Sequence, residues 1–128
     1  MVLRILAAIL KPLLLAPPVV RAGYLYATLV GLVWGAALST GRIRRVEGLF
    51  VCRGVPTWAF SRGGSCIGGV YLTDTNDAPT VLEHEAIHRR QWMTYGLTFP
   101  LVYALAGTDP LKNRFEIEAG LTKGGYLR

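Results

Sequence analysis

The sequence predicts a single α+β domain, and three stretches of the chain indicate it. Residues 1–45 are apolar with helical spacing, residues 46–73 are rich in β-formers between turn signals, and a helix is predicted to begin near Thr80. The length of 128 residues is that of one ordinary domain. We therefore divide the chain into apolar N-terminal helices, residues 1–45, and a small sheet-and-helix domain, residues 46–128.

The first twenty residues predict a short amphipathic helix. Leucine and isoleucine recur at helical spacing around Arg4 and Lys11, and the helix is expected to stop before Pro17-Pro18. A signal peptide is the competing interpretation. Lys11 and Pro12 interrupt the apolar centre that such a peptide needs, so we do not expect cleavage.

Residues 22–41 form a second apolar helix without a charged side chain. Its length matches the ~20 residues that cross a bilayer. Small residues recur at every fourth position, and Gly31 and Gly35 form a G-x-x-x-G pair that lets two helices approach closely. One interpretation is a membrane anchor that self-associates through Gly31 and Gly35. The other is a buried helix of a cytoplasmic protein, and membrane association at the cell membrane is slightly favoured.

Three strands are predicted in the middle of the chain, at 46–51, 57–60 and 67–72, separated by Gly- and Pro-containing turns. The loop that follows leads into the helix near Thr80, where Thr80 and Glu83 have the spacing of a capping box.

The net charge of +6 raises the question of an anionic partner. No nucleic-acid-binding motif is present, so we expect no nucleic acid. Arg42, Arg44 and Arg45 directly follow an apolar stretch, which favours membrane lipid headgroups as the partner. Cys52 and Cys66 lack metal-binding spacing and are expected to be buried thiols.

The predicted helix contains the chain's only two histidines, in the run His84-Glu85-Ala86-Ile87-His88. Histidines four positions apart lie on one helix face, so both imidazoles can reach one ion, which we expect to be zinc. Glu85 is rotated away from His84 by about 100° and is placed as the general base that takes a proton from water.

A catalytic zinc site needs a third protein ligand, and Asp109, Glu116 and Glu118 are the downstream candidates. A straight helix to residue 107 would carry the chain too far for these side chains to return. The helix is therefore predicted to break at Gly96 or Pro100, and the apolar run 97–106 to fold back toward the histidines.

These residues resemble the gluzincin metallopeptidases, in particular the minigluzincins and the CAAX-type and heat-shock-type membrane peptidases. The resemblance rests on His-Glu-Ala-Ile-His followed by Phe115-Glu116-Ile117-Glu118-Ala119, where the family has Glu-x-x-Ala-Asp. It implies a minimal zincin-like fold, with Glu116 as the third ligand on a C-terminal helix and Glu118 as the alternative. It also implies that Gly69, Val70 and Tyr71 belong to an edge strand that holds an extended substrate.

One position departs from that family, because Gly120 stands where its second-shell Asp is expected. Asp109, Asn113 and Glu118 are the residues that could replace this Asp. The resemblance implies a zinc metallopeptidase that acts on peptides or proteins. The alternatives are an inactive or self-blocked zinc-binding protein, and a membrane interaction module whose metal is structural.

Overall fold

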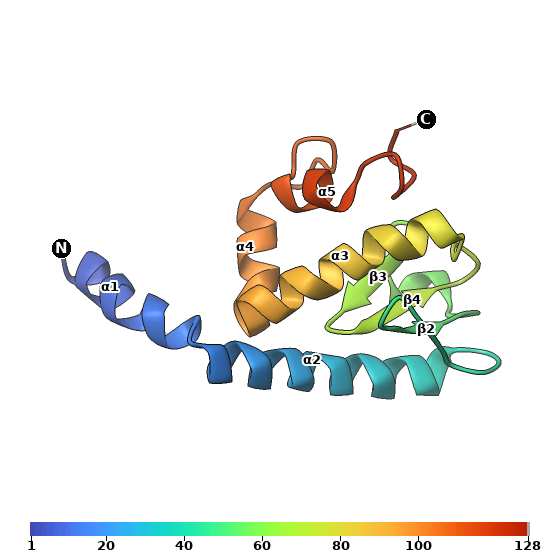
Figure 1. Ribbon diagram of the computed structural model, residues 1–128, viewed down its shortest axis with the longest axis horizontal. Helices are drawn as coiled ribbons and strands as arrows, with labels where there is room; N and C mark the ends of the chain where they lie inside the picture. The colour runs from blue at the N-terminus through green and yellow to red at the C-terminus, as the bar shows by residue number, and fades with distance from the viewer. Residues whose placement is uncertain (128) are drawn as a thin grey trace.

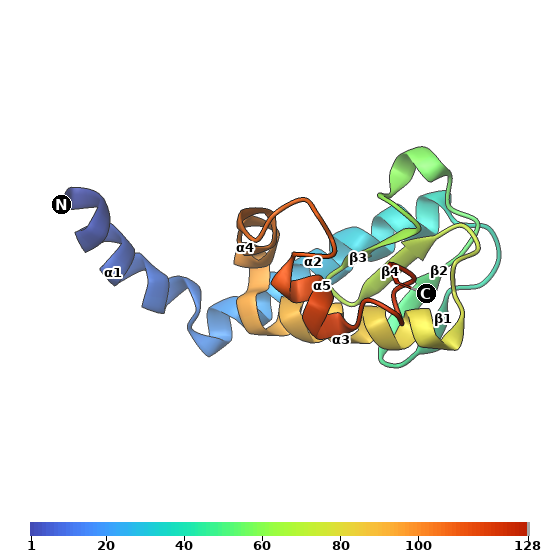
Figure 2. The ribbon, with the colours of Figure 1, turned by 90° about the horizontal axis from the view of Figure 1, so that it is seen from above.

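Two N-terminal helices precede the sheet in the computed structural model, which describes residues 1–127. α1 spans Val2–Leu14 and α2 spans Pro17–Leu38, and the chain breaks between them as predicted. Pro17 opens α2, where the first turn tolerates its missing N–H. α1 extends away from the rest of the molecule in both views and has no buried residue (Figures 1 and 2).

The small-residue face of α2 packs against its own domain. A Cβ atom added to Gly31 would lie 2.9 Å from the Cβ of Val70, and one added to Gly35 would lie 2.5 Å from the Cys52 sulfur. The glycines therefore let α2 approach the sheet closely, as the spacing predicted, but the partner is not a second helix. In this structure the sheet, and not a second chain, lies against Gly31 and Gly35, which were predicted to mediate self-association.

The sheet is mixed and has four strands, in the order β1-β2-β4-β3. The strands are β1 Arg44–Val46, β2 Leu49–Cys52, β3 Gly64–Ile67 and β4 Val70–Thr73. β2 and β4 run parallel, and the other pairs are antiparallel. The segments 46–51 and 67–72, each predicted as one strand, instead contain tight hairpin turns at Glu47-Gly48 and Gly68-Gly69.

The Gly68-Gly69 turn corrects the predicted edge strand. Gly68 has a φ of 58°, and a Cβ there would lie 2.5 Å from the Thr28 nitrogen, so only glycine suits this turn. The turn places β3 on the free side of β4. Gly69 therefore lies in a turn, Val70 and Tyr71 are buried in an interior strand, and the edge strand next to them is β3.

The strand predicted at 57–60 is also wrong. Thr57–Ala59 form a 3₁₀-helix, η1, in which the Ala59 N–H donates to the Pro56 carbonyl. This turn leads the chain from β2 to β3.

The metal-motif helix, α3, spans Pro79–Tyr95 and so begins where predicted. The predicted capping box is absent, because Ala78 is the N-cap and no side chain caps the helix. The helix ends at Gly96, whose φ is 59°. A Cβ at Gly96 would lie 2.7 Å from the Cα of Val20 in α2, so this residue permits both the turn and the close approach.

The predicted return of the chain is confirmed. η2 (Gly96–Thr98) and α4 (Phe99–Leu105, with Pro100 in its first turn) turn away from α3, and α5 (Arg114–Ala119) then packs back over it (Figure 1). An aromatic cluster that includes Trp92, Phe99 and Phe115 fills the space between these helices. The fold is therefore α+β, with α2 and α5 on opposite sides of α3.

The α2 packing can be tested with Gly31→Leu. The new side chain has no space beside Val70, so we expect the free energy of unfolding to fall by about 1–3 kcal/mol, the usual cost of overpacking. Denaturant unfolding measures this change. Ala36→Leu on the exposed face of α2 is the matched control and should leave stability nearly unchanged. Equal effects of the two substitutions would contradict the packing.

Candidate metal centre

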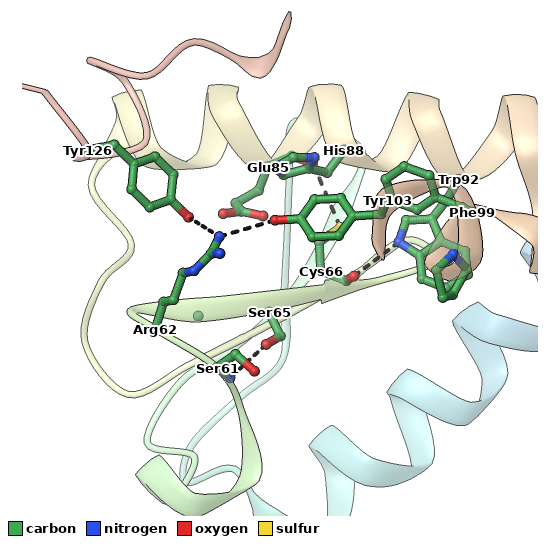
Figure 3. Close-up of a pocket in the computed structure, with 12 residues that line it drawn as sticks. Ser61, Arg62, Ser65, Cys66, Glu85, His88, Trp92, Phe99, Tyr103 and Tyr126 are labelled. Carbon is green, nitrogen blue, oxygen red and sulfur yellow. Dashed lines mark hydrogen bonds between the residues drawn. The ribbon is translucent and has the colours of Figure 1, made fainter. Parts of the chain in front are cut away.

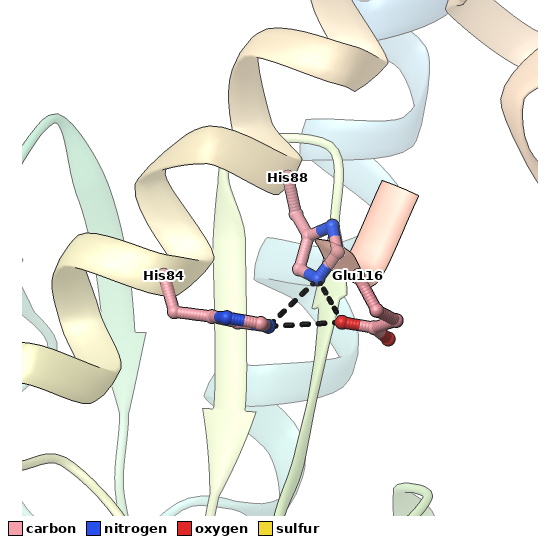
Figure 4. Close-up of side chains that lie close together, drawn as sticks. All are labelled: His84, His88 and Glu116. Carbon is pink, nitrogen blue, oxygen red and sulfur yellow. Dashed lines mark hydrogen bonds and ion pairs between the residues drawn. The ribbon is translucent and has the colours of Figure 1, made fainter. Parts of the chain in front are cut away.

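Two helices bring three acceptor atoms to one point. His84 and His88 lie one turn apart on α3, and α5 presents Glu116 to both (Figure 4). The Glu116 Oε1 atom lies 2.9 Å from His84 Nε2 and 2.8 Å from His88 Nε2, and the two nitrogens are 3.0 Å apart. All three side chains are buried, with exposed fractions of 1%, 6% and 3%. The structure therefore brings together the three residues that the sequence singled out.

The other nitrogen of each imidazole has an acceptor as its partner. His84 Nδ1 lies 2.7 Å from the Gly120 carbonyl, and His88 Nδ1 lies 2.7 Å from Gln91 Oε1. The Gln91 amide is oriented by its NH₂ group, which donates to the Phe115 carbonyl and to the Glu118 carboxylate. Both Nδ1 atoms must therefore carry the proton, which leaves the lone pairs of the neutral rings on Nε2.

Two lone pairs and a carboxylate oxygen within about 3 Å repel one another unless a cation lies among them. The cation is either a proton on an imidazole or a metal ion. Ligand atoms about 2.1 Å from one zinc ion lie about 3.4 Å apart at tetrahedral angles, about half an ångström more than these atoms. Small side-chain rotations close that difference, so the His-His-Glu group could hold a metal ion.

Burial by itself would lower the pKa of His88, but the neighbouring Glu116 carboxylate raises it above its ordinary value. The same charge that attracts a metal therefore attracts a competing proton.

A backbone carbonyl lies where the resemblance predicted an Asp side chain. The Gly120 carbonyl accepts from His84, the task for which a second-shell carboxylate was expected. The three proposed substitutes lie elsewhere: Asn113 caps α5 through the Phe115 N–H, and Asp109 accepts from the Leu111 N–H. Glu118 orients Gln91 and is not among the converging atoms, so the structure does not bring this alternative ligand to the centre.

Glu85 lies beside the centre and lines a pocket of about 460 Å³ together with His88 (Figure 3). Its side chain is almost fully buried, and this burial raises the pKa of Glu85 to about 7, against the opposing effect of the two histidines. A carboxyl group with this pKa can both accept and return a proton near neutral pH.

The outer oxygen of Glu116 is held by a network that the sequence did not predict. Arg62, in the turn before β3, donates through Nη1 to Glu116 Oε2 at 3.2 Å and to the hydroxyls of Tyr103 and Tyr126. Tyr103 also donates to Glu116 Oε2. Arg62 lies between the segments 57–60 and 67–72, and no local pattern indicates that its side chain contacts a residue 54 positions further along the chain.

The free edge of the sheet forms one wall of the pocket. Gly64, Ser65 and Cys66 of β3 line it, opposite Tyr103 and Tyr126. Burial raises the pKa of the Cys66 thiol well above its ordinary value, so this sulfur is a neutral wall atom rather than a ligand. Cys52 is a buried thiol, as predicted.

The ligand set can be tested with Glu116→Ala and Glu118→Ala. We expect the purified protein to bind one divalent metal ion and Glu116→Ala to lose it or to bind at least ~100-fold more weakly, because a charged ligand is removed. Glu118→Ala should retain the metal, since it lies beyond Gln91. Elemental analysis and competition with a chelator measure both. Retention in Glu116→Ala with loss in Glu118→Ala would contradict the site.

Metal affinity should also decrease as the pH is lowered. Binding needs neutral imidazoles, and the pKa of His88 is raised, so protons begin to compete above the ordinary histidine pKa of about 6.5. Below the pKa of His88, each unit by which the pH is lowered should weaken metal binding about tenfold for each proton that the metal displaces. A titration of metal binding between pH 8 and about 5 measures this. An affinity that is constant across the range would exclude the two histidines as ligands.

No known protein family, curated protein or solved structure matches this chain, so the assignment of the centre depends on its own geometry.

Proposed function

We propose that this protein is a zinc-dependent metallopeptidase of gluzincin type, which hydrolyses peptide bonds with zinc held by His84, His88 and Glu116. The observation that carries the proposal is the convergence of these three acceptors beside a pocket that contains Glu85. Two imidazoles and one carboxylate are a donor set typical of catalytic zinc.

The proposed reaction needs a group that moves one proton twice. Zinc, when bound, polarises the scissile carbonyl and makes water a better nucleophile at neutral pH. Glu85 lines the pocket beside His88, so its carboxylate accepts the proton of the attacking water and returns it to the leaving amine.

In this proposal the Tyr126 hydroxyl and the Arg62 guanidinium of the same pocket would stabilise negative charge on the substrate oxygen, because Tyr103 already donates its proton to Glu116. Burial raises the pKa of both Tyr103 and Tyr126, so each hydroxyl keeps its proton at neutral pH. The Arg62 guanidinium lies between them at 3.1 Å and 3.2 Å. Hydrogen-bond donors and positive charge at such a position favour the transition state over the ground state.

An extended peptide is the substrate class that this wall of the pocket favours. β3 pairs with β4 on one side only, and its residues line the pocket next to Glu85. A peptide that adds to the free edge of β3 gains main-chain hydrogen bonds and passes the centre. The substrate strand of this proposal is thus β3, in place of Gly69, Val70 and Tyr71.

A zinc-binding protein without turnover is the second candidate, and the C-terminal segment favours it. A Cβ atom added to Gly124 would lie 2.5 Å from the His84 ring, so this segment lies directly against one ligand. Tyr126 also occupies the pocket wall through its contact with Arg62. Such a segment would keep the centre self-blocked and leave a role in binding peptides.

We also propose that the protein is associated with a membrane. Among residues 1–127, α2 is the one helix whose length and apolar composition would allow it to cross a membrane. We place the protein at the cell membrane, with the cytoplasm as the alternative. A membrane interaction module with a structural metal is the corresponding non-enzymatic candidate.

Glu85→Gln separates catalysis from metal binding. It keeps the size of the side chain but cannot accept a proton, so we expect peptide hydrolysis to fall at least ~100-fold while zinc content stays at one per chain. A fluorogenic peptide library measures hydrolysis, and elemental analysis measures zinc. The matched control is Glu83→Gln on the exposed side of the same helix, which should retain both. A zinc-loaded wild-type protein without hydrolysis would instead support the self-blocked protein.

A further inference from the structure

The net positive charge of the chain, +6, equals the charge of its first 46 residues. These contain six Lys and Arg and no Asp or Glu. The chain as a whole has 14 basic and 8 acidic residues, so residues 47–128 hold 14 − 6 = 8 basic residues against all 8 acidic ones. The charges of residues 47–128 therefore balance, and residues 1–46, which comprise α1, α2 and β1, are purely basic.

The same part of the chain exposes most of its apolar side chains. The leucines and isoleucines of α1 are between 46% and 81% exposed, and none is buried. Basic residues Arg4 and Lys11 lie among them. At 1.5 Å per residue the 13 residues of α1 span about 20 Å, too short for the ~30 Å hydrocarbon core of a bilayer. An apolar helix of this kind is typical of one that lies in a membrane surface.

The outward face of α2 continues this apolar surface. Leu25, Leu29 and Val33 are 56%, 60% and 64% exposed, at helical spacing. At the C-terminal end of α2, Trp34 and the largely exposed Trp58 meet edge to face, with ring centroids 6.1 Å apart. Tryptophan favours the boundary between lipid headgroups and hydrocarbon.

The opposite face of α2 decides how the helix can meet a bilayer. Gly23 packs on Leu97 near the start of the helix, and Gly35 packs on Cys52 near its end. Between them Arg89 of α3 donates to the Tyr24 hydroxyl at 2.9 Å. The domain thus packs against α2 from the start of the helix to its end. A helix that crossed the membrane would have to leave the sheet or carry the domain, with Arg89, into hydrocarbon.

We propose that α1 and the outward face of α2 lie flat in the surface of a membrane that contains anionic lipids. The apolar side chains enter the hydrocarbon boundary, and Arg4, Lys11, Arg21 and Arg42 meet the lipid phosphates, whereas Arg44 is paired with Asp77. α5, which supplies Glu116, lies on the far side of α3 from α2 (Figure 1), so the metal centre faces away from the lipid. This inference does not depend on peptidase activity.

Binding to vesicles tests the surface. We expect the full-length protein to co-sediment with vesicles of phosphatidylcholine containing about 30% phosphatidylglycerol, and at least ~10-fold more weakly with pure phosphatidylcholine. Raising the salt from about 0.1 to 0.5 M should weaken binding to the anionic vesicles. Equal binding to both vesicle types, or binding to neither, would overturn the proposal.

Two charge substitutions at exposed leucines localise the contact. Leu29→Glu places a carboxylate in the apolar face of α2 and should weaken binding at least ~10-fold. Leu111→Glu is the matched control, 46% exposed in the loop before α5, and should bind as the unmodified protein does. Equal binding of both variants would overturn the proposal. So would a stable dimer that Leu29→Glu separates and that binds no vesicle, because a second chain would then cover this face.

Labelling distinguishes a flat helix from a spanning one. Single cysteines at Arg21→Cys and Arg42→Cys, in a background with Cys52→Ala and Cys66→Ala, mark the two ends of α2. A membrane-impermeant maleimide added outside sealed vesicles should label both ends of the bound protein. Protection of one end until detergent is added would show a spanning helix and overturn the flat arrangement. Far-UV circular dichroism reports separately whether each variant folds.

Discussion

The repulsion among three buried acceptors is the constraint on which the rest of the structure depends. His84, His88 and Glu116 meet at separations of about 3 Å, and their burial removes the water that would otherwise screen them. Only a cation relieves the repulsion among these three atoms, and the surrounding hydrogen bonds hold the side chains in place. Gln91 and the Gly120 carbonyl fix the two rings, and Arg62 and Tyr103 hold the outer oxygen of Glu116. No buried side-chain nitrogen or oxygen among residues 1–127 lacks a partner, so the polar centre is fully connected.

The Gly120 carbonyl shows how a second shell can be built without the residue type that a motif leads one to expect. Gly120 ends α5, and its carbonyl accepts both from His84 and from the backbone N–H of Gly124. The φ of 100° at this position suits glycine and would strain an aspartate. The backbone thus orients His84 at the turn that ends α5, and Gln91 orients His88 from within α3.

Two faces of the molecule carry different chemistry, and α3 lies between them. On one side, α5 and β3 enclose the metal centre and the pocket with Glu85. On the other, α2 presents leucine, valine and tryptophan to the solvent, and every unbalanced positive charge belongs to the N-terminal segment. In the proposed arrangement the metal centre lies on the face opposite the lipid surface. It would therefore act on peptide chains in the aqueous phase rather than within the bilayer.

The sequence alone determined the features that depend on local spacing. These are the helical pair His84 and His88, the break near Gly96, the return of the chain, and the small-residue face of α2, because helical period and glycine geometry are short-range properties. Tertiary structure decided the rest. The hairpin turns inside two apolar runs determine which strands lie at the edge of the sheet. The long-range packing of α2 on the sheet determines which residues contact its glycines. Arg62 and the Gly120 carbonyl entered the site through contacts 54 and 36 positions apart, which no local pattern encodes.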